Sequence, residues 1–260
     1  SVGGSGAIFW MWIAAISGMA IKFFTCSLSC MYRNPKRDHN HEGGPMYYIE
    51  IGMGKRYRYL AMIFAACGMV GCLGVFQSNQ LATLLEAEWA VKPLTTGFLA
   101  ALTVGMIVRG GTIKVRKFAS LVVPIMGLSY LISASIVILA HYKQVPTVFA
   151  SIILGAFNPE AGLGGAVGLS VRQVIVTGVK RAIFSNEAGV GTEALAHSTA
   201  KTTQPIREGF VGMLGPIIDT HLICTATALV ILTSDSYSKN GILATAEAFE
   251  KTMPGVGATI

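Results

Sequence analysis

Long apolar segments separated by short polar clusters restrict what this chain can fold into more than any other feature of its sequence. A helix that crosses a lipid bilayer needs roughly 17–25 mostly apolar residues, and the sequence contains several runs of about that length. Only 13% of its 260 residues are charged, whereas soluble domains carry about 25%. We therefore predict an all-α integral membrane protein.

The apolar pattern predicts six transmembrane spans. They cover residues 6–31, 59–85, 94–108, 118–140, 166–200 and 209–232. The third span is near the lower limit for crossing a bilayer, and residues 145–157 are too few to cross, which is typical of an interfacial or re-entrant half-helix. After the last span, residues 233–254 are predicted to form a polar tail.

Lysine and arginine residues are distributed unevenly between the loops. The loop after the first span holds six of them and the loop after the third holds four, whereas the loops after the second and fourth spans hold one each, Lys92 and Lys143. Cytoplasmic loops are enriched in these residues, so residues 32–58, 109–117 and 201–208 are predicted to be cytoplasmic. These clusters explain the net charge of +7. Nucleic-acid binding, which needs a gathered basic face, is not expected.

The fifth span carries a concentration of polar residues around two glycines, Gly189 and Gly191. The polar side chains are Ser185, Asn186, Glu187, Thr192, Glu193 and His197. Non-helical backbone is tolerated at membrane depth where it lines a cavity, and half-helix ends bind substrate charge and cations in secondary transporters. We predict that the helix is broken near Gly189–Gly191 and lines a small polar cavity. The alternative is a kinked helix whose polar side chains bond neighbouring helices.

Other polar side chains lie inside the predicted spans. Gln77 and Asn79 occur in the second span, and Asp219 occurs in the sixth. Buried amides cost free energy unless they are bonded, so Gln77 and Asn79 either join helices or contact a ligand, and both interpretations stay open. Ionisable residues inside a membrane indicate function by default. Lys22, in the first span, could pair with a carboxylate or extend its ammonium to the interface.

Enzyme and cofactor motifs are absent from the sequence. The five cysteines fall inside apolar runs at spacings that match no zinc or haem template, and no zinc-protease, nucleophile-elbow or P-loop motif is present. The glycines of the fifth span partly resemble a dinucleotide fingerprint, but that motif needs a preceding strand. We therefore expect neither an enzyme nor an organic cofactor nor a metal site built from side chains.

Several stretches of the sequence resemble the alanine/glycine:cation symporter family. They are Trp10-Met-Trp-Ile13, Gly43-Gly-Pro-Met-Tyr-Tyr-Ile49, Phe184-Ser-Asn-Glu-Ala-Gly189, Ala196-His-Ser-Thr-Ala200 and Gly212-Met-Leu-Gly-Pro-Ile-Ile-Asp-Thr220. These stretches follow the family's order across nearly the whole chain, and the Ser-Asn-Glu-Ala-Gly block is specific.

The resemblance implies a sodium-coupled (in some members proton-coupled) importer of small neutral amino acids, alanine or glycine, that works by alternating access. It implies the inverted-repeat fold of bacterial leucine transporters in the APC superfamily, with two five-helix repeats and broken first and sixth helices. The six spans would be helices two to seven. Residues 1–260 would then be one multi-pass transporter domain of the bacterial inner membrane, truncated at both ends, with Na⁺ as its coupling ion.

The resemblance also implies where the substrate binds. By similarity, Gln77 and the segment 184–192 would face it. Together with the polar residues noted above, the predicted substrate contacts are Gln77, Asn79, Phe184, Ser185, Asn186, Gly189, Gly191 and Thr192, while Glu187 and Asp219 are expected to serve ion coupling or structure. Most sodium ligands are expected in helices outside this chain. The rival interpretation is a channel or a non-transporting membrane scaffold, in which the glycines only pack.

Overall fold

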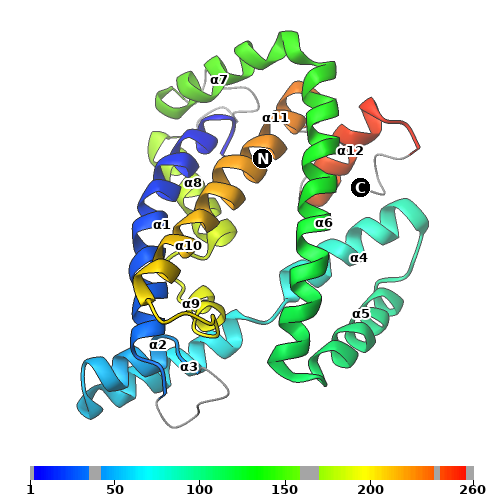
Figure 1. The fold of residues 1–260 in the computed structure, drawn as a ribbon. Coiled ribbons are helices and arrows are strands. Elements are labelled where there is room, and N and C mark those ends of the chain that lie inside the picture. Colours follow the sequence, from blue (N-terminus) through cyan, green and yellow to red (C-terminus); the bar gives the residue numbers. More distant parts are fainter. Residues whose placement is uncertain (1–2, 35–41, 159–169, 237–240, 256–260) are drawn as a thin grey trace. The chain divides into compact units, whose positions relative to one another are not determined.

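The computed structural model describes residues 3–34, 42–158, 170–236 and 241–255 (Figure 1). Every regular element in these ranges is helical. The α-helices are α1 (Gly6–Met31), α2 (Pro45–Tyr47), α3 (Arg58–Gly71), α4 (Val75–Trp89), α5 (Pro93–Val108), α6 (Gly111–Ala140), α7 (Val145–Phe157), α8 (Val171–Asn186), α9 (Thr192–His197), α10 (Pro205–Pro216), α11 (Thr225–Thr233) and α12 (Ile242–Thr252). Between them lie two π-helical segments, η1 (Tyr48–Gly52) and η5 (Ile217–Cys224), and the short 3₁₀ turns η2 (Lys55–Tyr57) and η3 (Tyr142–Gln144).

Four helical segments in the described ranges are long and apolar enough to cross a membrane. They are Gly6–Met31, Lys55–Trp89, Ile113–Ala140 and Pro205–Thr233. The helix Pro93–Val108 is apolar but shorter, and α7 has only 13 residues, too few to cross. The prediction of an all-helical chain is confirmed for the described residues, and these apolar helices are consistent with a membrane protein.

The second predicted span is interrupted. α3 ends at Gly71 and α4 begins at Val75, so residues 72–74 are not helical. Gly71 and Gly74 flank this interruption, and each glycine lowers helix stability by about 1 kcal/mol relative to alanine. Hydropathy does not show the interruption, because the residues within it are themselves mostly apolar.

The helices form two compact units. The described residues of 2–73 and 151–225 make up the α1 unit, and those of 74–150 and 226–260 make up the α6 unit. Therefore α1–α3, α8–α10 and η5 belong to the α1 unit, and α4–α6 and α12 belong to the α6 unit. The boundaries between the units fall inside α7 and α11.

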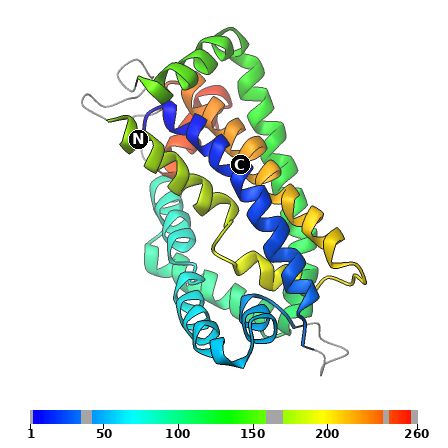
Figure 2. The same ribbon diagram turned by 90° about the vertical axis from the view of Figure 1, so that its left-hand side faces the viewer.

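In the α1 unit, α8 and α10 lie along α1 (Figures 1 and 2). Glycines permit these close crossings. A Cβ atom at Gly178 of α8 would lie 2.8 Å from the Cβ atom of Trp10, and one at Gly212 of α10 would lie 2.7 Å from the sulfur of Cys26. Because both distances are too short for a packed side chain, the helices approach closely only where a small residue stands.

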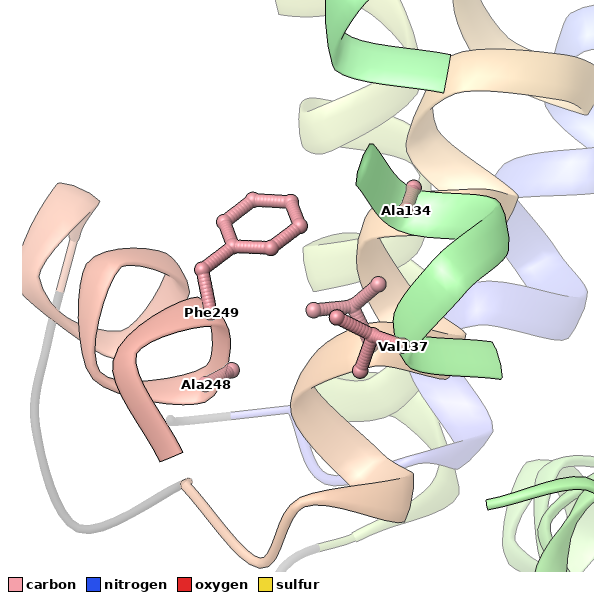
Figure 3. Packing of buried hydrophobic residues seen from close by; sticks show 5 residues of the cluster. Ala134, Val137, Ala248 and Phe249 are labelled. Carbon is pink, nitrogen blue, oxygen red and sulfur yellow. The ribbon is translucent and has the colours of Figure 1, made fainter. Parts of the chain in front are cut away.

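A hydrophobic core joins α6, α11 and α12 in the α6 unit (Figure 3). Its buried members are Ala134 and Val137 of α6, Val230 of α11, and Ala248 and Phe249 of α12. The ring of Phe249 points toward α6 (Figure 3) and meets the ring of Tyr130 edge-on, with centroids 5.7 Å apart.

The polar tail predicted for residues 233–254 is wrong, because this segment contains α12. The helix is amphipathic: Ala244, Ala248 and Phe249 are buried, whereas Lys251 is exposed. With 11 residues it is too short to give a membrane-span signal. Its first turn is capped from α4, since the Gln80 side-chain oxygen accepts a hydrogen bond from the backbone N–H of Ile242 over 2.9 Å.

Replacing Phe249 by alanine should lower the free energy of unfolding by about 3–5 kcal/mol, because it removes a buried ring and leaves a cavity in the core of the α6 unit. Phe249→Leu keeps most of the apolar volume and should cost much less. Thermal unfolding of the purified protein in detergent measures both variants. Equal effects of the two would show that the ring does not fill this core.

Candidate functional site

The fifth predicted span is broken into two helices. α8 ends at Asn186 and α9 begins at Thr192, and the interruption can be followed in Figure 2. Gly189 and Gly191 have φ angles of 88° and 83°, which glycine adopts without the steric cost that a side chain imposes. The predicted break near Gly189–Gly191 is confirmed, and the glycines make it possible.

The C-terminal end of α8 faces the break. Glu187, with a φ of 54°, ends the helix in the left-handed region, and its N–H donates to the Ile183 carbonyl over 2.9 Å. The last carbonyl groups of a helix have no partner within the helix, and this end carries a partial negative charge. The end of α8 is therefore suited to stabilising a cation.

Hydrogen bonds anchor the side of the break that is buried against η5 and α1, which we call its inner side. Asn186, only 2% exposed, donates from Nδ2 to the Thr220 hydroxyl over 3.2 Å and accepts at Oδ1 from the Ala188 N–H over 3.0 Å. The hydroxyl of Ser185 lies 3.2 Å from the sulfur of Cys224. Thr220 and Cys224 belong to η5, so this π-helical segment holds the end of α8.

α1 lies directly against the same side of the break. A Cβ atom at Gly18 would be 3.0 Å from the Cβ atom of Ala188 and 3.4 Å from the Asn186 amide nitrogen. Gly191, at the start of α9, is buried and equally confined, since a Cβ atom there would lie 3.0 Å from Pro45 and 3.2 Å from Phe64. The two glycines therefore allow the break to be enclosed on its inner side.

The opposite side of the break, which we call its outer side, is exposed. Phe184 is 54% exposed, and Glu187 and Gly189 are exposed as well. The hydroxyl of Thr192 donates to Oε2 of Glu187 over 2.5 Å, so one side-chain hydrogen bond joins the two ends of the break. This side brings together an aromatic ring, a carboxylate and accessible backbone, which is the mixture of apolar and polar groups that small-ligand sites use.

The two amides of the second predicted span lie in the α6 unit. Gln77 and Asn79 are exposed residues of α4. Their neighbour Gln80 caps α12, so in this case the amide joins two helices. Gln77 and Asn79 remain predicted ligand contacts.

The charged residues Asp219 and Lys22 lie in the α1 unit. Asp219 is a partly exposed residue of η5, and its carboxylate experiences the charges of Lys22 and Glu187. Lys22 is only 6% exposed. Its ammonium occupies the space beside Gly215, where a Cβ atom would be 2.8 Å from Nζ. Of the two possibilities for Lys22, extension to the interface is therefore wrong.

Two polar side chains of α1, Thr25 and Ser29, and Arg33 just beyond its C-terminal end hold α9 and its following loop. The sequence motifs did not point to these residues. Their hydrogen bonds are Thr25 Oγ1 to Glu193 Oε1 (3.0 Å), Ser29 Oγ to the Ala194 carbonyl (2.6 Å) and Arg33 Nη2 to the Ala200 carbonyl (2.6 Å). Thr25 and Ser29 are four residues apart, which places them on one face of α1, and Arg33 follows at the same spacing after the helix has ended. This spacing of polar residues is the signal that could have found them.

A helix broken between polar, glycine-containing ends is a feature of many secondary transporters. The comparison with known families gives the particular family. The model of the sodium:alanine symporter family matches residues 1–260, and the chain therefore belongs to this family. The resemblance seen in the sequence motifs is confirmed.

Curated relatives agree with this membership. An uncharacterised transporter of Haemophilus influenzae is 38% identical over 99% of this chain and 58% of its own length. The sodium/alanine symporter AgcS of Methanococcus maripaludis is 34% identical over 97% of this chain and 57% of its own length. The probable sodium/glutamine symporter GlnT of Bacillus subtilis is 37% identical, with shares of 93% and 50%. The chain spans about half the length of these relatives.

Alanine substitutions at the two glycines should separate backbone strain from steric contact. Gly189→Ala should cost about 1–2 kcal/mol for the left-handed conformation alone, since a Cβ atom there meets nothing within 4 Å in the described residues. Gly191→Ala has the same conformational cost, and its added Cβ atom also crowds Pro45 and Phe64, so the melting temperature of this variant should fall further. Thermal unfolding in detergent measures both, and an equal fall would contradict the enclosure of Gly191.

Proposed function

We propose that this protein is a sodium-coupled symporter that imports small neutral amino acids, with alanine or glycine as its substrate. Membership of the sodium:alanine symporter family supports the class, and relatives named as sodium/alanine and sodium/glutamine symporters support a neutral amino acid with Na⁺. The observation that carries the proposal is the α8–α9 break, because its carbonyl end is suited to binding Na⁺ and its exposed side chains are suited to binding an amino acid.

In this proposal, the outer side of the break binds the ligands. The carbonyl end of α8 and the carboxylate of Glu187 attract Na⁺, because a cation is stabilised by the negative end of a helix dipole. Phe184, Thr192 and the exposed backbone at Gly189 contact the amino acid, the ring covering its short apolar side chain. Gln77 and Asn79 of α4 supply further polar contacts to the substrate.

The inner side of the break positions these groups. Asn186 and Ser185 fix the end of α8 on η5, and Gly191 fixes the start of α9. Asp219 is assigned to ion coupling or to structure, because it carries a charge on the element that holds the break. Loss of any of these residues would displace the ligand-binding groups without removing one of them.

The mechanism proposed is alternating access, in which a four-helix bundle rocks around the broken helix. Buried hydrogen bonds join α8 and α9 to η5 and α1, and glycine crossings join α8 and α10 to α1, so these helices are suited to moving as one body. The fold proposed for the protein is the inverted-repeat fold of leucine transporters, with the described spans as helices two to seven. The protein is proposed to lie in a bacterial inner membrane.

Reconstitution of the full-length protein in liposomes tests the coupling. Labelled alanine should accumulate when an inward Na⁺ gradient is imposed, and uptake should saturate, because a carrier has a limited number of sites. Replacing external Na⁺ by choline should abolish the accumulation. Equal uptake in choline would remove sodium from the proposal, downhill flux without saturation would indicate a channel, and no flux in either medium would favour a scaffold.

Single substitutions test the proposed substrate contacts. Gln77→Ala and Phe184→Ala should each raise the KM for alanine about tenfold, the equivalent of about 1.4 kcal/mol of lost binding, with unchanged amounts of protein in the membrane. Gln204→Ala, at an exposed position between α9 and α10, is the matched control and should leave KM unchanged. Wild-type kinetics in both test variants would move the substrate site elsewhere.

A further inference from the structure

Glu193 of α9 is a buried carboxylate with one occupied and one open oxygen. The residue is 9% exposed, and its Oε1 accepts a hydrogen bond from the Thr25 hydroxyl over 3.0 Å. Its Oε2 is buried and has no hydrogen-bond partner among the residues that the structure describes. Taking a carboxylate out of water costs several kcal/mol unless it is paired, so the open oxygen needs a partner.

The buried ammonium of Lys22 is not that partner. Lys22 lies one turn before Thr25 on α1, but its ammonium sits beside Gly215 of α10 and its charge acts on Asp219. Within the described ranges, no ion pair joins Lys22 to Glu193. The carboxylate therefore keeps its open oxygen while a buried cation is present in the same unit.

In the described part of the chain, a thiol and a phenol lie within reach of the Glu193 charge. Its carboxylate acts on the Cys26 thiol of α1 and on the Tyr48 phenol of η1. Burial raises the pKa of Tyr48 and the charge of Glu193 raises it further, so the phenol is neutral at physiological pH. Glu208 of α10 also acts on Cys26, and the carboxylate of Glu208 is itself 2.6 Å from His197 Nδ1.

We propose that the open oxygen of Glu193 binds a monovalent cation, Na⁺ or a proton, at a site distinct from the outer side of the α8–α9 break. Either cation neutralises the buried carboxylate, and each gives Oε2 the partner that it needs. The inference rests on the proposed function, because a cation-coupled symporter must bind and release cations as it changes conformation. Since Glu193 also accepts from Thr25, occupancy of this site would be linked to the contact that holds α9 on α1.

Cation binding to the purified full-length protein tests this site directly. Glu193→Gln keeps the shape of the side chain and removes its charge, so the variant should bind about one cation fewer per chain. Equilibrium binding of ²²Na⁺ at constant pH reports the sodium arm. Proton uptake on lowering the pH, compared between the wild type and Glu193→Gln, reports the proton arm.

The matched control is Glu88→Gln, because Glu88 is an exposed carboxylate of α4 and should change neither measurement. A deficit of one Na⁺ or of one proton in Glu193→Gln supports the site and identifies its cation. Wild-type binding in both arms overturns it. Because binding is measured without transport, absence of alanine uptake would count against the proposed function and leave this result standing.

Lys22→Met provides a second variant in case Glu193→Gln does not fold. Removing the buried positive charge should tighten cation binding at Glu193, because the ammonium and the bound cation repel each other. Combining it with Glu193→Gln should abolish the gain. Unchanged or weaker cation binding in Lys22→Met overturns the proposal.

Discussion

A membrane helix that stops at depth must find hydrogen-bond partners inside the protein, because hydrocarbon offers none. At the α8–α9 break these partners come from side chains. Asn186 bonds both the Ala188 N–H and the Thr220 hydroxyl, and Ser29 bonds the Ala194 carbonyl. These bonds require α1 and η5 to lie against the break, and Gly18 lets α1 come close enough. The arrangement of the α1 unit follows from this single requirement.

The polar residues of the fifth span consequently divide into two sets. Asn186 and Ser185 face inward: both contact η5, and Asn186 also accepts from the Ala188 N–H. Phe184, Glu187 and Gly189 face outward and are exposed. The sequence offered two interpretations of these residues, a ligand site and helix-to-helix contacts, and the structure shows helix contacts on the inner side. Among the described residues, the exposed groups of the break lie on its outer side, and this exposure supports the proposal that a ligand binds there.

Properties that depend on a short stretch of sequence could be predicted. The apolar runs predicted a helical membrane protein, and two glycines among polar residues predicted the break. Properties that depend on distant contacts could not. α12 is stabilised by Ala134 and Val137 of another helix, so its own 11 residues look like a polar tail. The destination of Lys22 depends on Gly215, almost two hundred positions later in the chain, and no local pattern contains that information.

Glu193 and Lys22 show why charge placement is informative in this unit. Two buried charges of opposite sign would ordinarily pair, since an unpaired buried charge costs several kcal/mol. A closed pair would fasten α9 to α1 and leave no carboxylate oxygen for another cation. In the structure Lys22 instead reaches across to α10, and Thr25 occupies only one oxygen of Glu193. Proteins tend to break packing rules at functional sites, and the half-satisfied carboxylate of Glu193 therefore supports the cation site proposed there.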